Sequence, residues 1–217
     1  MKILELFSGT HSIGKVFKPA GFDVLSLDLQ GADINIDILK WNYKEYPQNY
    51  FDVIWASPPC VTFSALRFSH IGRRLKKFDN KIVTKEMLEK DMIDIGLPIL
   101  RKTQEIINYF NPQYWFIENP QTGRMKKFMN NIFYYDVEYC QYGFDYKKPT
   151  RIWTNLENFN NKRCNKECSK KIPGTNKHIT NIQGYSTNMK YRIPEPLIKE
   201  ILKTITKNNI ENFLKIK

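Results

Sequence analysis

The feature that most constrains this chain is a short apolar run that begins at residue 51 and ends at two prolines followed by Cys60. Its Val53, Ile54 and Trp55 are typical of a buried strand. The prolines cannot extend that strand, because proline lacks a backbone N–H and has a fixed φ angle. The pattern therefore predicts a strand that ends in a stiff turn carrying a thiol.

In an open α/β sheet, ligands bind in the crevice outside the carboxyl ends of the strands. A thiol held at that place is well positioned for covalent catalysis. The alternative for Cys60 is an ordinary buried cysteine without a chemical role. The sequence on either side of it bears on that choice.

Residues 3–7 form another apolar run, and a glycine turn at residues 8–14 separates it from an amphipathic stretch. This order predicts a strand, a glycine turn and a helix. Glycine allows the backbone to approach a ligand closely, and the helix N-terminus offers unpaired N–H groups. A plain tight turn would have the same sequence, so the signal is weak by itself.

Two acidic residues follow at predicted strand ends. Residues 21–28 predict a strand ending in Asp28, at the spacing where dinucleotide-binding folds place an acid for the ribose hydroxyls. Residues 34–38 alternate apolar and polar side chains, and Asp37 falls at their end, where it would accept from an adenine amino group. Either acid is also suited to capping a helix.

Residues 114–120 repeat the pattern of the cysteine strand, because an apolar run ends in Glu118, Asn119 and a proline. A second strand end would thus present a carboxyl group to the same crevice, where it suits a proton donor. The structural alternative for Glu118 is a salt bridge to a basic side chain.

The chain has 34 Lys and Arg against 22 Asp and Glu, a net charge of +12, which favours either a nucleic-acid partner or a solvated basic surface. Residues 61–81 are basic and aromatic, typical of a mobile arm that closes on a phosphate backbone or of an exposed basic turn. Arg151 suits a forked contact with a carbonyl or phosphate, or with carbonyls of a sheet edge.

Residues 156–190 are rich in Asn, Lys, Gly and Thr and poor in core-forming side chains. A small module without a core needs a staple, and Cys164, Cys168 and His178 offer three zinc ligands, with Cys140 as a candidate fourth. The C-x3-C-x9-H spacing is imperfect for zinc, which leaves ordinary loop residues as the alternative.

These patterns divide the chain into a catalytic domain at 1–155, the small module at 156–190 and a C-terminal helix at 191–217 that packs back on the first domain. No stretch resembles a membrane span, and Glu5 falls where a signal peptide needs its apolar centre. We therefore expect an intracellular protein without membrane contact, whose cysteines are thiols or metal ligands.

With Cys60, Glu118 and Asp28 at three strand ends, residues 1–155 resemble the cytosine-5 DNA methyltransferases. Residues 58–64 resemble that family's nucleophile loop, and Glu118 with Asn119 resembles its Glu-Asn motif. The resemblance implies an α/β, Rossmann-like S-adenosylmethionine-dependent methyltransferase fold with a very small recognition module, as in compact viral and phage versions.

The resemblance also implies roles for individual residues. The catalytic residues would be Cys60, Glu118 and Arg151. Those expected to bind S-adenosylmethionine are Phe7, Ser8, Gly9, Thr10, His11, Ser12, Asp28, Leu29, Asp37, Ile38, Ser57 and Pro59. Those expected to contact nucleic acid are Ser64, Arg67, Arg73, Arg74, Lys76, Asn119, Lys147 and Lys148.

The implied reaction transfers a methyl group to carbon 5 of a cytosine flipped out of double-stranded DNA, through a covalent Cys60 adduct. A lowered pKa of Cys60 or a nearby base would be needed to form the thiolate. His11 and Ser12 replace glycines usual in the family, and Val61 replaces a glutamine. Two alternatives follow: the same chemistry on tRNA, with RNA the less expected partner, or a catalytically silent nucleic-acid-binding relative.

Overall fold

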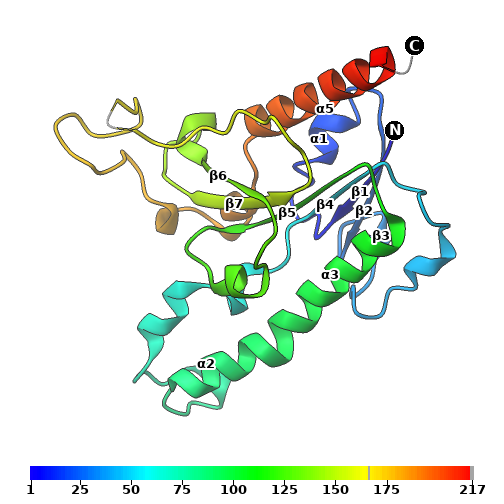
Figure 1. Cartoon of the computed structure of the whole chain (residues 1–217). Coiled ribbons are helices and arrows are strands. Elements are labelled where there is room, and N and C mark those ends of the chain that lie inside the picture. Colours follow the sequence, from blue (N-terminus) through cyan, green and yellow to red (C-terminus); the bar gives the residue numbers. More distant parts are fainter. Residues whose placement is uncertain (166, 216–217) are drawn as a thin grey trace.

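A seven-stranded sheet with helices on both faces forms the centre of this computed structural model, which describes residues 1–165 and 167–215 (Figure 1). The strand order is β3-β2-β1-β4-β5-β7-β6. The strands are β1 (Lys2–Leu6), β2 (Asp23–Asp28), β3 (Ile34–Asn35), β4 (Val53–Ala56), β5 (Tyr114–Pro120), β6 (Tyr134–Glu138) and β7 (Pro149–Thr154). Neighbours among β1 to β5 pair in parallel, whereas β7 is antiparallel to β5 and β6. The predicted Rossmann-like α/β fold is confirmed.

The helices connect and cover these strands. They are α1 (Gly14–Phe17), α2 (Lys85–Asp91), α3 (Leu97–Phe110), α4 (Thr187–Tyr191) and α5 (Glu195–Lys215). A π-helical turn, Met92–Gly96, joins α2 to α3. Pro98 lies in the first turn of α3, where its missing N–H costs little, so α2 and α3 run on as one long rod (Figure 1).

Side chains alternate across the sheet and fill two separate cores. Ile3 and Trp55 belong to the core beside α1 and α5, whereas their neighbours Leu4 and Ile54 belong to the core beside α3. Burial of both faces is what a largely parallel sheet requires, and it explains the continuous apolar runs in the sequence. The cores fix the strand ends where the expected site residues lie.

The last helix belongs to the main body of the protein. Leu197, Ile198 and Ile201 of α5 are buried in the same core as Val16 and Phe17 of α1. Residues 216–217, which end the segment expected to form this helix, lie outside the described residues. Among the residues described, no helix combines the length and apolar character that crossing a membrane requires.

Segment 156–190 is built differently from the rest. Leu156 and Phe159 are buried in the main core, but from residue 160 to residue 190 Cys168 is the only buried residue among those described. Figure 1 shows much of this segment as long loops that project from the sheet. The predicted lack of an apolar core therefore describes residues 160–190 and not the first few residues of the segment.

Candidate active site

Cys60 lies in a short turn of 3-10 helix, Cys60–Thr62, directly after β4 and the two prolines. The Asn119 side-chain N–H group donates a hydrogen bond of 2.8 Å to the Pro58 carbonyl. This contact ties the turn after β4 to the end of the neighbouring strand β5. The thiol is thus half-buried on a turn that is held from both sides.

Gly96 of the π-helical turn also fixes this loop. A Cβ atom at residue 96 would lie 2.3 Å from Thr62 Oγ1 and 3.0 Å from the Phe63 ring. Only glycine therefore permits the helical rod to lie so close to the turn that carries Cys60. The π-helical turn is consistent with a functional position, because such turns are often found at functional sites.

Glu118 is almost fully buried in β5 and has two polar neighbours. The Tyr139 hydroxyl donates to its Oε1 at 3.1 Å, and Lys148 Nζ lies 3.8 Å from the same oxygen. Because a carboxylate oxygen has two lone pairs and Oε2 has no protein partner described, the group retains capacity to bind a ligand.

Burial raises the pKa of the Cys60 thiol, and the negative charge of Glu118 raises it further, whereas Lys148 opposes this effect. Of the two expected means of forming the thiolate, a lowered thiol pKa or a nearby base, the first is therefore wrong for the free protein. Both causes disfavour the thiolate, the first by removing water and the second by like-charge repulsion.

Cys60 and Glu118 line one cavity of about 610 Å³, a size within the range of sites for small-molecule ligands. The expected cofactor residues, with the exception of His11, line the same cavity. His11 instead places its Nε2 2.7 Å from the Gly31 carbonyl oxygen, in the loop between β2 and β3. The structure thus brings the expected thiol, carboxylate and cofactor residues together and leaves His11 outside.

The loop after β1 has the features of a ligand cradle. The Gly9 N–H donates to Asp28 Oδ2 at 2.8 Å. Asp28, the last residue of β2, therefore holds the backbone of the loop after β1 in place. Phe7 has a φ of 59°, a conformation unusual for a bulky residue and common at functional sites. Ser8 Oγ is buried without a hydrogen-bond partner, which fits a polar ligand at this place.

The role expected for Arg151 is not supported by its position. Its guanidinium makes two hydrogen bonds to the Asp136 carboxylate, at 2.7 and 2.9 Å, and stacks on Tyr134. Arg151 does not line the cavity, whereas Lys148 does. The antiparallel pairing of β6 with β7 puts Asp136 directly opposite Arg151, which explains the ion pair.

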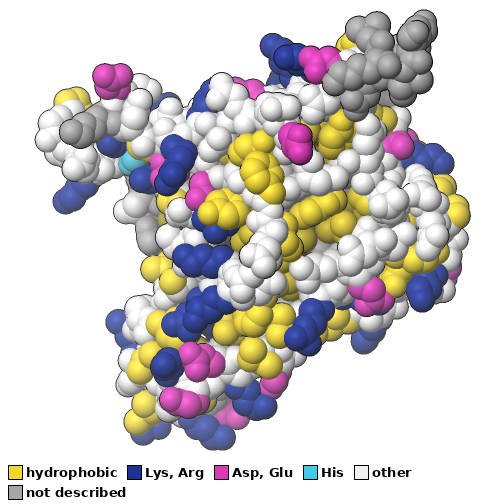
Figure 2. All heavy atoms as spheres, viewed as in Figure 1, with side chains coloured by type: hydrophobic (Ala, Val, Ile, Leu, Met, Phe, Trp, Pro, Cys, Tyr) yellow, Lys and Arg dark blue, Asp and Glu magenta, His cyan; other side chains and the backbone are white. Residues whose placement is uncertain are grey.

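The residues expected to contact nucleic acid divide into two groups. Ser64, Lys147 and Lys148 line the cavity, and Arg73, Arg74 and Lys76 are exposed on the loop before α2. Figure 2 shows Lys and Arg side chains along the left edge of the molecule.

Two expected contacts are corrected. Arg67 pairs with the Asp91 carboxylate, and only 11% of its side chain is exposed. Asn119 is 1% exposed and holds Pro58, so both residues support the loop and are not available to a phosphate.

Several cavity residues escaped the sequence interpretation. Lys190, Tyr191 and Ile193 line the cavity from the chain that leads into α5. The Ile193 N–H donates to Ser12 Oγ at 3.1 Å, which joins this distant segment to the cofactor loop. No local sequence motif identifies these residues, because they reach the cavity only through the packing of α5 and the segment before it against α1 and the loop after β1.

The sheet order and the shared cavity define a Rossmann-like protein with a thiol and a carboxylate at neighbouring strand ends. The chain is 39% identical over 218 residues to the probable DNA (cytosine-5)-methyltransferase of Frog virus 3 (isolate Goorha), across 93% of this chain and 99% of that protein. The chain therefore belongs to the DNA (cytosine-5)-methyltransferase family. No protein-family model matches it.

Solved structures similar to this one include the methyltransferase EhMeth of Entamoeba histolytica, with a TM-score of 0.49 and 14% identity over 76% of this chain and 55% of that chain. A putative DNA modification methyltransferase encoded within an E. coli prophage has a TM-score of 0.46 and 14% identity over 76% of this chain and 52% of that chain. This chain thus matches about half the length of those structures.

Proposed function

We propose that the protein methylates carbon 5 of cytosine in double-stranded DNA, with S-adenosylmethionine as the methyl donor. The observation that carries the proposal is the single cavity in which Cys60, Glu118 and the loop after β1 meet. Membership of the DNA (cytosine-5)-methyltransferase family supports the same reaction class. The Cys60 thiol suits attack on a ring carbon better than any other group lining this cavity.

Cytosine carbon 5 is too weak a nucleophile to accept a methyl group unaided. Attack of the Cys60 thiolate on carbon 6 forms a carbon–sulfur bond and moves electron density to carbon 5. Once carbon 5 carries the methyl group, its proton leaves to a base, the carbon–sulfur bond breaks and the thiolate is released. Cys60 is thus restored at the end of each cycle.

Glu118 in its protonated form would donate a hydrogen bond to ring nitrogen 3 of cytosine and accept one from the amino group. These bonds stabilise the charge that develops when sulfur adds to carbon 6. The proton that Glu118 carries when the base is bound also removes the negative charge that helps to raise the pKa of Cys60. Substrate binding would therefore promote formation of the nucleophile.

We assign to Lys148 the role in holding the target base that the resemblance implied for Arg151. Lys148 lines the cavity and its Nζ lies beside Glu118, where an ammonium group would hold the carbonyl oxygen of cytosine or a neighbouring phosphate. Arg151 would stabilise the pairing of β6 with β7 through Asp136 and would not contact the substrate.

S-adenosylmethionine would supply the electrophilic methyl group. The backbone turn at residues 8–12 and the Ser8 hydroxyl would hold it, and Asp28 would accept from its ribose hydroxyls. Asp37, whose Oδ1 accepts from the Leu39 N–H at 3.0 Å, would accept from the adenine amino group. These positions would keep the donor and Cys60 in one cavity.

A cytosine inside a duplex cannot reach this cavity, so the base would flip out at a cost of a few kcal/mol. Exposed Arg73, Arg74 and Lys76 lie on a loop that would offset that cost by contacts with phosphates. Because the catalytic thiol must stay reduced, we place the activity inside the cell, and in the cytoplasm or nucleus of the host if the chain is viral.

The test is methyl transfer from labelled S-adenosylmethionine to equal amounts of duplex DNA and tRNA, followed by sequencing for 5-methylcytosine. We expect label in DNA and little in tRNA. Label mainly in tRNA would move the proposal to RNA chemistry, which the small size of segment 156–190 keeps open. DNA binding without label in either substrate would identify a silent relative.

A further inference from the structure

We propose that Cys140, Cys164, Cys168 and His178 bind one Zn²⁺ ion, and that this ion fastens segment 160–190 to the end of β6 beside the active site. The methylation reaction does not require such an ion. The site would therefore be an additional, structural feature of this chain.

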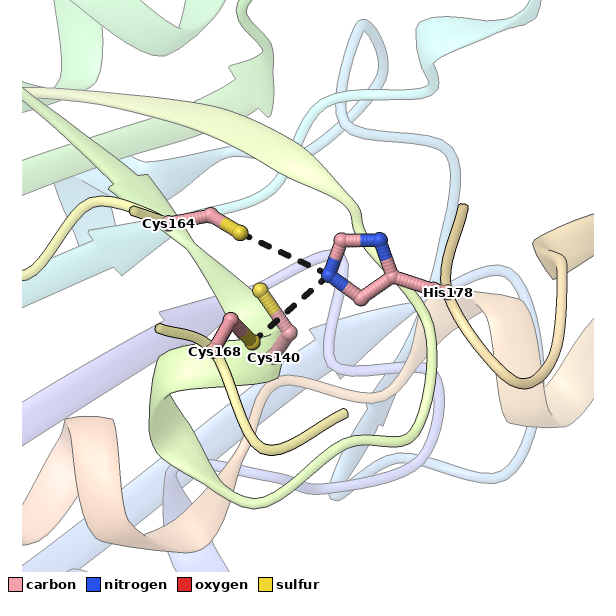
Figure 3. A group of neighbouring side chains, drawn as sticks. All are labelled: Cys140, Cys164, Cys168 and His178. Carbon is pink, nitrogen blue, oxygen red and sulfur yellow. Dashed lines mark hydrogen bonds between the residues drawn. The ribbon is translucent and has the colours of Figure 1, made fainter. Parts of the chain in front are cut away.

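The ligand atoms converge from three parts of the chain. Cys140 follows β6 in the turn Tyr139–Tyr142, whereas Cys164, Cys168 and His178 belong to the loops of the projecting segment. Their three sulfur atoms and one ring nitrogen all lie within 4.8 Å of one another (Figure 3). Figure 3 shows the His178 ring directed at the three sulfurs.

The distances match those of a tetrahedral zinc site. Zn–S bonds of about 2.3 Å and Zn–N bonds of about 2.0–2.1 Å place sulfur and nitrogen about 3.6 Å apart at a tetrahedral angle. His178 Nε2 lies 3.5 Å from Cys164 Sγ and 3.7 Å from Cys168 Sγ. Four protein ligands leave no open position, which is typical of a structural zinc rather than a catalytic one.

The surrounding backbone is arranged to hold the ligands. The Cys168 carbonyl accepts the Lys171 N–H at 3.0 Å, which closes a tight turn after the cysteine. A bridge between Lys171 and His178 then returns the chain so that the histidine faces the sulfurs. This tight turn followed by a hairpin brings residues ten positions apart to one ion.

The described residues of 160–190 are tied to the main body by polar contacts such as Lys162 with Glu200 and Lys170 with Asp145, but they bury very little apolar surface. Ile172 is 42% exposed and Ile179 is 59% exposed, and Cys168 is the only described residue in this range that is buried. A polypeptide with so little buried apolar surface cannot offset its loss of chain entropy by packing alone. Metal ligation supplies the missing stabilisation, because binding free energy becomes folding free energy.

The site is also linked to the active site through the end of β6. Glu138 accepts the backbone N–H of Cys164 with one oxygen and pairs with Lys147 Nζ at 3.0 Å with the other. The next residue, Tyr139, donates its hydroxyl to Glu118. An ion at Cys140 would therefore steady the turn that positions Tyr139 on the catalytic carboxylate.

Binding releases protons and involves no redox step. Each of the three thiols loses its proton to solvent as a zinc–sulfur bond forms, and His178 binds through a neutral ring nitrogen. A disulfide between two of these cysteines is the competing arrangement, and it would need an oxidant. All four cysteines of the chain are free thiols here.

The test is the metal content of the full chain purified under reducing conditions without chelator. We expect about one zinc per chain, falling to less than about a tenth of an equivalent in Cys164→Ser and in His178→Asn. The variant Cys60→Ser is the matched control, because it removes a thiol outside the cluster and must retain its zinc. It also separates the two proposals, since it abolishes methylation without touching the metal.

A second measurement uses wild-type protein alone, so that misfolding of a variant does not decide the result. Stripping with chelator and refilling with Co²⁺ should give the absorption of a tetrahedral cobalt–thiolate site, and trypsin should cut within residues 160–190 faster in the stripped protein. Purified protein that lacks zinc and takes up neither metal would overturn the proposal. So would a disulfide in the cluster, or a Cys140→Ser variant that binds zinc as tightly as wild type.

Discussion

Two cysteine-bearing regions of this protein are held in place by opposite means. The Cys60 turn lies between two cores and is fixed by prolines, by the Asn119 amide and by the close approach of Gly96. Among the described residues of the projecting segment, 160–190, only Cys168 is buried, and the Cys164, Cys168 and His178 side chains lie against one another and Cys140. A turn held by backbone packing leaves its thiol free to react, whereas the thiols of the proposed zinc site would be bound to the metal. The two regions should therefore respond separately to substitution.

The largest effect is expected for Cys60→Ser. A serine hydroxyl has a similar size but cannot form a thiolate-like nucleophile, so methyl transfer should fall below a few per cent of wild type. Because the turn is held by its backbone, the circular dichroism spectrum and S-adenosylmethionine affinity should be unchanged. Methylation that survives this change would remove Cys60 from the mechanism.

Glu118→Gln should follow, with a loss of about 100-fold in kcat, since one of the groups that stabilise charge on the base is altered. The amide still accepts the Tyr139 hydroxyl, so the fold and the affinity for the cofactor should be kept. Steady-state kinetics with saturating DNA measures the loss. An unchanged kcat would show that Glu118 has only a structural role.

Lys148→Met and Arg151→Met test whether each of two basic residues near the start of β7 acts in catalysis or in stabilising the fold. Loss of a charge-assisted contact at Lys148 should lower kcat/KM about 10-fold or more, whereas Lys203→Met on the exposed face of α5 should change nothing. Arg151→Met should leave Asp136 with only the Gln121 amide as a side-chain partner and cost about 1–3 kcal/mol of unfolding free energy, measured by urea denaturation. The reverse pattern would restore Arg151 to the substrate site.

Gly96→Ala should move the Cys60 turn, because the new methyl group would meet Thr62 Oγ1 at 2.3 Å. We expect about 1–3 kcal/mol of destabilisation and a several-fold lower kcat. Gly184→Ala is the matched control in the projecting segment, since nothing lies within 4 Å of a Cβ atom at residue 184. Equal effects of the two changes would contradict the proposed difference between the regions.

The smallest effect concerns pH. Burial and the Glu118 charge raise the pKa of Cys60, so its thiolate fraction, and with it alkylation by iodoacetamide, should still be increasing above pH 8.5, near the usual thiol pKa. Removing the negative charge in Glu118→Gln lowers that pKa, and the rise in alkylation should move to lower pH. Peptide mapping assigns the label to Cys60, and Glu211→Gln should show the wild-type profile.

Sequence reasoning succeeded where one strand and its end contain the whole signal. The runs before Cys60, Asp28 and Glu118 became β4, β2 and β5, and their carboxyl ends meet at one cavity because parallel strands share an edge. The Rossmann-like fold was expected from the resemblance that these motifs carry, and it is confirmed. The short β3 ended earlier than the alternating pattern of residues 34–38 predicted.

Sequence reasoning failed where the outcome depended on contacts between residues distant in the chain. The resemblance implied that Arg151 holds the target base, but the register of β6 against β7 pairs it with Asp136. A lowered pKa of Cys60 or a nearby base was expected from the needs of catalysis, but burial and Glu118 raise that pKa. Tyr191 and Ile193 reach the cavity only because α5 packs back on α1.

The central claim is that Cys60 forms a covalent bond to carbon 6 of the target cytosine. Duplex DNA carrying 5-fluorocytosine tests it directly, since fluorine at carbon 5 blocks the elimination that frees the enzyme. With S-adenosylmethionine present, wild-type protein should form a complex that survives denaturing electrophoresis, and mass spectrometry should place the DNA on Cys60. No such complex should form with Cys60→Ser. A stable complex mapped to another residue, or none with protein that methylates ordinary DNA, would contradict the claim.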